Sequence, residues 1–359
     1  MLAPNNSPTP GHTRWREPAT VQTAALVVVG AAAVWFLLHE LAPLLRPLLI
    51  ATILAYVLMP YHSRIRKQMT GPVSLVILAG VTAAGLGVIA LMVYANVVRL
   101  SEELPELQGR AVSLIHGAEE WVAANAPWLV RGAGEGNRVD TPRLAERLTV
   151  AVRPVLNAIG EALLEACVVG LYLLFLLLEA SRFPDRVRQA YAPERAEEIL
   201  ALAGQVNSAI MSYLKAKVKS SLILAIPVGF VLAIFGVEFA ILWAVLTFLC
   251  NFIPYVGTVV AYSLPVGFAF LQLPLDWAPI AVAILILLCH LGAATIVEPM
   301  LLGRAVGLSP LVILGSLGFW GLLWGIPGMF LAVPLTVVSV IVMGYFPFTR
   351  PVAKLLGGS

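Results

Sequence analysis

Long apolar runs recur along most of this chain, and no other feature restricts its fold as strongly. A helix needs about 20 apolar residues to cross roughly 30 Å of hydrocarbon, because each residue advances it by about 1.5 Å. Charged residues make up only 12% of the chain, whereas soluble globular domains carry about 25%. A surface with so little charge has to face lipid instead of water. We therefore expect an all-α, polytopic integral membrane protein.

The apolar runs group into about eight hydrophobic units, two of them broken into helical hairpins, with polar stretches between them. Two of these polar stretches are long enough to form structure outside the lipid. In chain order, the predicted segments are a disordered cytoplasmic tail (1–20), three N-terminal membrane spans (21–98), a small helical extracytoplasmic insert (99–155), a fourth span (156–179), a cytoplasmic amphipathic segment (180–219), a C-terminal membrane domain with both broken hairpins (220–346) and a cytoplasmic tail (347–359).

The positions of Lys and Arg predict the orientation of the chain. They concentrate in 60–71 and 180–219, more weakly at Arg304, and again at the C-terminal end. Cytoplasmic loops carry an excess of these residues. All of these positions share one side of the membrane if both termini are cytoplasmic, and the 99–155 insert is then outside. The first apolar run, Val21–Leu38, is expected to stay as a signal anchor, because it is long for a cleaved signal peptide.

Two apolar units are interrupted by helix-breaking residues, one at 251–257 and one at 325–328. Lipid offers no hydrogen-bond partners, so irregular backbone at membrane depth needs protein or a water-filled cavity around it. On the predicted topology the first break opens from the cytoplasm and the second from outside. Paired breaks of opposed orientation indicate a transporter's binding site. The alternative is that each break is a tight turn between two short spans. The residues that shape the backbone there are Pro254, Gly257, Gly325, Pro327 and Gly328.

Glu298 is the leading candidate for coupling, because an ionisable residue near hydrocarbon is costly and usually functional. It follows a long apolar run and precedes Pro299. It could carry a proton or a cation, or it could be an interfacial carboxylate that pairs with Arg304 across the turn. His290 lies eight residues earlier, about 80° away around a helix, so both side chains could line one face. His290 could relay protons, or it could be a neutral side chain packed against a neighbouring helix.

Asn251 and Tyr255 frame the first break. They could coordinate a polar substrate, or they could cap the turn. Three lysines, Lys215, Lys217 and Lys219, lie at the end of the amphipathic segment. We expect them to follow the positive-inside rule or to contact anionic lipid rather than to bind substrate.

Several motifs occur in a fixed order along the C-terminal half: Ile253-Pro254-Tyr255-Val256-Gly257, Leu264-Pro265, the run from Glu298-Pro299 through Gly303-Arg304 to Pro310, Gly325-Ile326-Pro327-Gly328-Met329 and Leu331-Ala332-Val333-Pro334. This order resembles the signature of the autoinducer-2 exporter family of bacterial membrane proteins. The resemblance covers essentially the whole chain and is strongest from about 200 to 345. The stretch from Ser212 to Lys217 departs from the family pattern in being more basic.

The resemblance implies a homo-oligomeric secondary transporter in the bacterial inner (plasma) membrane. It implies substrates that range from autoinducer-2, a small furanosyl signalling molecule, to sodium ions exchanged for protons. Combined with the breaks, it predicts alternating access. The candidate pathway and gating residues are Asn251, Pro254, Tyr255, Gly257, His290, Glu298, Pro299, Gly303, Arg304, Gly325, Pro327 and Gly328.

We therefore expect a transporter that moves a small polar solute or a monovalent cation in exchange for protons. The alternative is a non-transporting scaffold that binds a partner through the 99–155 insert. An enzyme is not expected, because Gly315-Ser316-Leu317-Gly318 does not fit the nucleophile motif Gly-x-Ser-x-Gly. His-Glu-x-x-His and phosphate-binding glycine motifs are also absent from the sequence.

No cofactor or metal is expected. All three cysteines fall in apolar stretches, which favours neither a disulfide framework nor a zinc site. The expected partners are the small-molecule or cation substrate, the lipid bilayer and further copies of the chain. A net charge of +3 is too small to suggest nucleic-acid binding.

Overall fold

The structure is a computed structural model that describes residues 18–65, 71–125, 160–161, 164–180, 182–302 and 307–357. These residues form helices and no β-strand, which confirms the all-α fold class. Four described helices are long and apolar enough to cross a membrane, or up to six if each of two bent pairs counts as one span. The polytopic prediction is thereby confirmed. Most of the predicted disordered tail, 1–17, lies outside the described residues.

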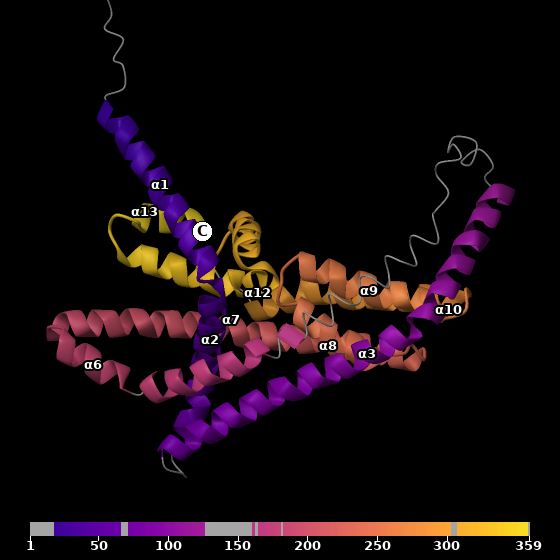
Figure 1. The fold of residues 1–359 in the computed structure, drawn as a ribbon, viewed down its shortest axis with the longest axis horizontal. Helices are drawn as coiled ribbons and strands as arrows, with labels where there is room; N and C mark the ends of the chain where they lie inside the picture. Colours follow the sequence, from indigo (N-terminus) through magenta and orange to yellow (C-terminus); the bar gives the residue numbers. More distant parts are fainter. Residues whose placement is uncertain are drawn as a thin grey trace, which may run out of the picture. The chain divides into compact units, whose positions relative to one another are not determined.

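The range of the three predicted N-terminal spans holds the helices α1 (Pro18–Glu40), α2 (Ala42–Ile65) and α3 (Gly71–Asn125) (Figure 1). α3 contains a candidate span by itself, whereas α1 and α2 pass the same length and hydropathy test only as a bent pair. The chain divides into two compact units, Met1–Leu45 and Arg46–Ser359. In the first unit, the apolar side chains of α1 from Ala25 to Leu37 are exposed, as expected of a helix that faces lipid.

α3 continues without a break for 55 residues. It passes from the apolar third span into the first part of the predicted helical insert, so the boundary expected at residue 99 is not a helix end. The rest of that insert, 126–159, lies outside the described residues.

α7 (Pro193–Ile234) is the longest element of the C-terminal half, with 42 residues. It follows the helix Leu164–Ala180 and the short helix α6 (Phe183–Ala190). At 1.5 Å per residue it is about 63 Å long, twice the thickness of the hydrocarbon layer. From Pro193 onward, the predicted amphipathic segment and the span after it therefore form one continuous helix.

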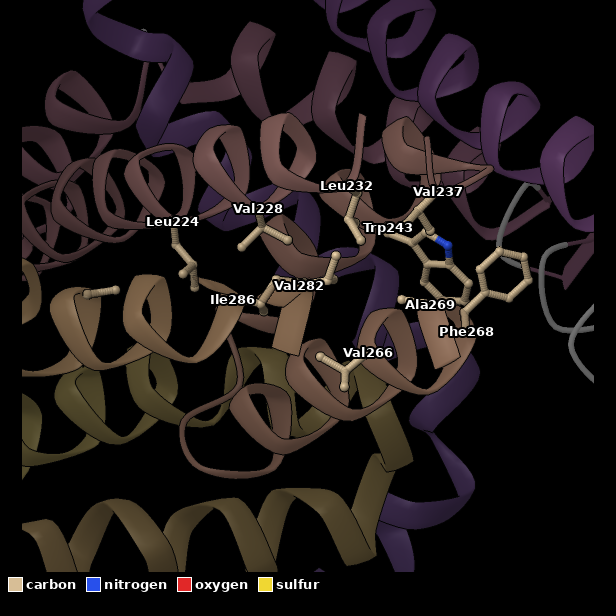
Figure 2. Close-up of a cluster of buried hydrophobic side chains, with 11 residues drawn as sticks. Leu224, Val228, Leu232, Val237, Trp243, Val266, Phe268, Ala269, Val282 and Ile286 are labelled. Atoms are coloured by element: carbon tan, nitrogen blue, oxygen red, sulfur yellow. The ribbon is translucent and has the colours of Figure 1, made fainter. Parts of the chain in front are cut away.

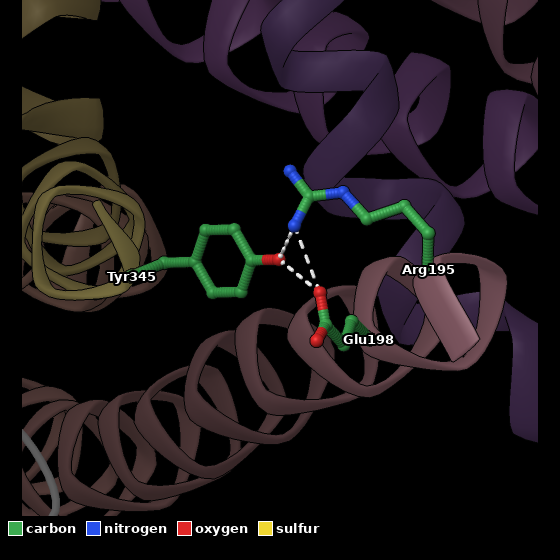
Figure 3. Close-up of polar contacts among 3 residues, drawn as sticks. All are labelled: Arg195, Glu198 and Tyr345. Atoms are coloured by element: carbon green, nitrogen blue, oxygen red, sulfur yellow. Dashed lines mark hydrogen bonds and ion pairs between the residues drawn. The ribbon is translucent and has the colours of Figure 1, made fainter. Parts of the chain in front are cut away.

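The start of α7 lies beside the end of α12 (Pro310–Tyr345) (Figure 3). Arg195 Nη1 donates hydrogen bonds to Glu198 Oε2 at 2.8 Å and to the Tyr345 hydroxyl at 2.6 Å. The Tyr345 hydroxyl in turn donates to Glu198 Oε2 at 2.9 Å. These groups are exposed, so they contribute little stability, but they show that the two helix ends share one side of the molecule.

The first predicted broken hairpin consists of α8 (Ala240–Cys250) and α9 (Val256–Gln272). α8 has 11 residues, which gives a length of about 16 Å. That is about half of what a membrane crossing needs. α10 (Trp277–Gly292) follows, and then the π-helical turn η2 (Ala293–Val297) and the short helix α11 (Glu298–Leu302).

The second predicted hairpin lies within α12, which folds back on itself at Gly325. Gly325 has φ 68° and ψ −145°, a combination that only glycine adopts without strain. Leu317 and Ala332, one from each side of the break, pack in the same core cluster. In a straight helix they would be roughly 22 Å apart. Both broken hairpins of the predicted fold are therefore present. The final helix is α13 (Arg350–Leu356).

The main core holds α7, α8, α9 and α10 together (Figure 2). α7 contributes Leu224, Val228 and Leu232, which recur every four residues and so lie on one face. Val282 and Ile286 of α10 repeat the pattern and are fully buried. This packing fixes the rotation of α7 about its axis, and with it the direction in which the polar residues of α7 point.

The tips of the two hairpins touch. The rings of Phe252, in the first break, and Phe330, just after the second, stack with their centroids 4.8 Å apart. Ile253 packs into the cluster that holds both arms of α12. α8 begins and α9 ends at the far end of α7, where Gln272 bonds to Gly236 and Glu238. Since α12 ends beside Arg195, at the start of α7, the hairpins approach from opposite ends of the helix bundle.

Two glycines allow these hairpins to close. A Cβ atom on Gly257 would overlap the carbonyl group of Cys250, and one on Gly328 would overlap that of Trp320. Each carbonyl lies across its own break from the glycine. Only a residue without a side chain permits so close an approach.

We expect Gly257→Ala and Gly328→Ala each to lower the free energy of unfolding by about 1–3 kcal/mol or more, because the backbone must move to admit the methyl group. Thermal unfolding of the detergent-purified protein measures the loss. Gly267→Ala in α9 is the matched control, since its Cβ would meet nothing within 4 Å. A loss of the same size in this control would contradict the steric explanation.

Candidate functional site

One face of α7 carries polar side chains in the middle of the helix bundle. Tyr213, Lys217, Ser220 and Ser221 follow a spacing of four, three and one, so they lie on the same face of the helix. All four are buried, and both serines are fully enclosed. Buried polar groups of this kind require partners on the helices packed against them. Those partners come from α8 and α11.

The first partner is Glu298, at the start of α11. Lys217 Nζ donates to Glu298 Oε1 at 2.6 Å. The Lys217 side chain is 4% exposed and that of Glu298 is 30% exposed. Removing the Glu298 carboxylate would leave the buried Lys217 ammonium without a counter-charge, which is strongly destabilising.

Local backbone chemistry puts Glu298 where Lys217 can reach it. Pro299 has no N–H, and its ring would clash with the carbonyl of residue 295 in a regular α-helix. The chain widens into the π-turn η2 just before, and the N–H of Glu298 bonds to the carbonyl of Ala293. Such π-turns inside helices occur frequently at functional sites.

The second partner is Asn251, at the C-terminal end of α8. Asn251 Nδ2 lies 3.0 Å from Ser221 Oγ and 3.5 Å from Ser220 Oγ, and all three residues are buried. Asn251 thereby attaches the first break to the middle of α7. We define the central polar cluster as Lys217, Ser220, Ser221, Asn251 and Glu298.

Two buried hydroxyls flank this cluster. The Tyr213 hydroxyl, one turn of α7 before Lys217, and Thr247 Oγ1, one turn of α8 before Asn251, have no hydrogen-bond partner among the described residues. Tyr213 is 4% exposed and Thr247 is completely buried. Native proteins rarely leave buried hydroxyls unpaired.

Tyr255 and Asn251 have different environments, although both frame the first break. Tyr255 has φ 62° and ψ −64°, and the carbonyl of Pro254 accepts a hydrogen bond from the N–H of Val256 at 2.7 Å. This is a γ-turn of the strained, positive-φ kind, which structures store mainly at functional sites. The Tyr255 side chain is exposed and takes no part in the central polar cluster.

His290 lies apart from the cluster. It is buried in α10, where Nδ1 donates to the carbonyl of Ile286 at 3.1 Å and the ring packs edge-on against Tyr262. Its Nε2 has no partner among the described residues. The described contacts do not join it to Glu298, the residue with which we expected it to share a face.

The other predicted residues divide between the breaks and the segment after α11. Pro254, Gly257, Gly325, Pro327 and Gly328 form the two breaks, and Pro299 lies in α11. Gly303 and Arg304 lie outside the described residues, so the predicted pairing of Glu298 with Arg304 is not described, whereas its pairing with Lys217 is.

The sequence analysis missed five residues of this region: Tyr213, Lys217, Ser220, Ser221 and Thr247. We expected Lys217 to contact lipid headgroups, yet it is buried and paired. The available signal was the spacing of polar residues on one face of α7, which indicates a polar interior face in a membrane helix. No group of three or more His, Cys, Asp or Glu that could hold a metal ion occurs in the part of the chain that the structure describes.

Comparison with known proteins gives a consistent set of relatives. The sequence model of the AI-2E transporter family matches residues 24–347. The chain is 28% identical over 341 residues to "Putative transport protein YhhT" of Escherichia coli (strain K12), which covers 94% of this chain and 93% of that protein. It is 33% identical over 202 residues to "AI-2 transport protein TqsA" of the same strain, covering 56% of this chain and 58% of that protein.

We expect Asn251→Ala to lower the free energy of unfolding by about 1–3 kcal/mol, because the buried serine hydroxyls lose their partner. Chemical or thermal unfolding in detergent measures the change. Asn96→Ala is the control, since among the described residues the Asn96 amide bonds to the carbonyl of Met92 in its own helix and to no other helix. A neutral Asn251→Ala would mean that the amide does not hold the first break to α7.

Proposed function

The chain belongs to the AI-2E transporter family, and we propose that it is a secondary transporter that moves a small polar solute or a monovalent cation across the bacterial inner membrane in exchange for protons. The observation that carries the proposal is the ion pair between the buried Lys217 and Glu298, in a polar cluster that also holds Asn251 of the first break. Ionisable residues inside the membrane mark substrate paths and proton relays.

Glu298 is the coupling residue in this mechanism. Its carboxylate can hold a proton, a cationic or hydroxyl-bearing cargo, or the ammonium of Lys217, but only one of them fully at a time. An exchanger requires a site that holds one partner at a time, because it must face one side of the membrane with cargo bound and return with a proton bound. The 30% exposure of the Glu298 side chain leaves a route by which either can arrive.

The broken hairpins are the moving parts. α8 is too short to cross the hydrocarbon layer, which supports a first break at bilayer depth. Irregular backbone at that depth has to border protein or water. Because Phe252 and Phe330 stack, a shift of one hairpin tip changes the packing of the other. This contact provides a physical link between a gate on one side and a gate on the other.

The proposed arrangement keeps both termini in the cytoplasm and the 99–155 insert outside. The contact of Arg195 with Tyr345 supports it, since it brings the start of α7 and the end of α12 to one side. We also propose a homo-oligomer, as the family resemblance implies. The cargo candidates are autoinducer-2, which the name of the relative TqsA mentions, and a monovalent cation.

We expect Glu298→Gln to abolish exchange, because an amide can neither take up a proton nor hold a cation. The full-length protein is reconstituted into liposomes that contain a pH-sensitive dye. Proton movement is then followed after Na⁺, K⁺ or autoinducer-2 is added outside. The variant should give only the signal of empty liposomes.

Glu197→Gln is the matched control, because Glu197 is an exposed carboxylate that pairs with Arg188. It should exchange at the wild-type rate. Unchanged exchange in Glu298→Gln would remove this residue from the mechanism. A wild-type protein that moves no protons with any cargo would instead favour a scaffold that binds its partner through the insert.

A further inference from the structure

We propose that Lys217 is an internal competitor of the cargo: its ammonium occupies Glu298 while the site is empty and moves to the Tyr213 hydroxyl when a small monovalent cation takes its place. This inference rests on the proposed function and adds to it a residue that selects the charge of the cargo. It also assigns a role to a buried hydroxyl that the fold does not use.

The first argument is that Glu298 always keeps a counter-charge. In the structure, one ammonium neutralises its carboxylate, and the lysine side chain is buried. A carboxylate left without a counter-charge in such surroundings is costly. Replacing the ammonium at Glu298 by another single positive charge keeps the carboxylate neutralised, and the only excess charge is that of the displaced ammonium. A divalent cation would leave a larger excess of positive charge beside Lys217, and hard divalent ions also prefer more carboxylates than the one that the cluster offers.

The second argument is that the displaced ammonium has a place to go. Tyr213 and Lys217 are one helical turn apart on the same face of α7, so their side chains are neighbours. The Tyr213 hydroxyl is 4% exposed and has no partner among the described residues, so its oxygen is available to accept a hydrogen bond. Its ring face can also attract the ammonium.

The third argument is that a static ion pair would leave the buried Tyr213 hydroxyl, one helical turn from Lys217, without a role. A fixed structural ion pair has no need for a second, unpaired acceptor one turn away. A lysine that alternates between two positions does, because an ammonium left without any partner in the interior would be strongly destabilising.

The cluster also supplies oxygen atoms for a cation seated at Glu298. Ser220 and Ser221 follow Lys217 by three and four residues on the same face, and Asn251 contacts both. Asn251 ends the half-helix α8, whose C-terminal carbonyls carry the negative end of the helix dipole. Half-helix ends of this kind coordinate monovalent cations in other transporters.

The test is a cation titration of the full-length protein in detergent. The thermal midpoint is recorded against NaCl, KCl or methylammonium chloride, with choline chloride keeping the ionic strength constant, and an apparent Kd is fitted for each cation. The variants are Lys217→Gln, Tyr213→Phe and the double variant. Lys219→Gln is the matched control, because Lys219 is exposed on the same helix and its loss changes the net charge equally.

Three results are expected for at least one of these cations. Lys217→Gln binds it about tenfold more tightly or better, because the competitor is gone. Tyr213→Phe binds it severalfold more weakly, because the displaced lysine has lost its second acceptor. The double variant behaves like Lys217→Gln, since the hydroxyl matters only through the lysine, and Lys219→Gln behaves like the wild type.

Opposite or absent effects overturn the inference. If Lys217→Gln binds every cation more weakly, Lys217 supports the cargo site and does not compete for it. If Tyr213→Phe matches the wild type, the hydroxyl is idle. Tyr213→Phe removes one unpaired oxygen and should fold even if Lys217→Gln does not, so the proposal can still be refuted. Suppose that no cation shifts the thermal midpoint of any variant while Glu298-dependent exchange persists in liposomes. The inference that Lys217 competes with the cargo is then refuted, and the proposed function stands.

Discussion

The ion pair between Lys217 and Glu298 depends on the rest of the structure, and the structure in turn is organised around it. Two charges in apolar surroundings are tolerated only when their geometry is held closely. The apolar core of α7, α8, α9 and α10 fixes the rotation of α7, and the π-turn at Pro299 aims Glu298 at that face. A change in the charge of either residue would therefore alter how α7 and α11 pack against each other.

The two broken hairpins solve a related problem, which is how to end a helix inside a layer without water. Each turns with a glycine against a backbone carbonyl, Gly257 against Cys250 and Gly328 against Trp320. The first also holds a strained residue, Tyr255, at its tip. The tips meet through Phe252 and Phe330. The contact between the tips packs the first break against α12, and in the proposed exchanger it would join the two gates.

Sequence reasoning found the elements of this architecture but not all of their boundaries. The apolar spans and both breaks were predicted from two physical requirements. A helix needs about 20 apolar residues to cross the hydrocarbon layer, and backbone N–H and C=O groups without hydrogen bonds are costly there. The continuity of α3 past Val98 and of α7 across Lys219 was not predicted. At those points the composition changes from apolar to polar, which indicates that the chain passes from lipid into water. A helix can continue through that boundary without a break.

The candidate site divides in the same way. The sequence by itself determined that Glu298 is an ionisable group near hydrocarbon and that Asn251 borders a break, because both statements depend only on neighbours along the chain. Tertiary structure alone decided that Glu298 meets Lys217, 81 residues away, and that His290 stays apart. The physical reason is that such pairings follow from how each helix is rotated and packed. That rotation is set by the summed burial of many apolar side chains and has no local signature.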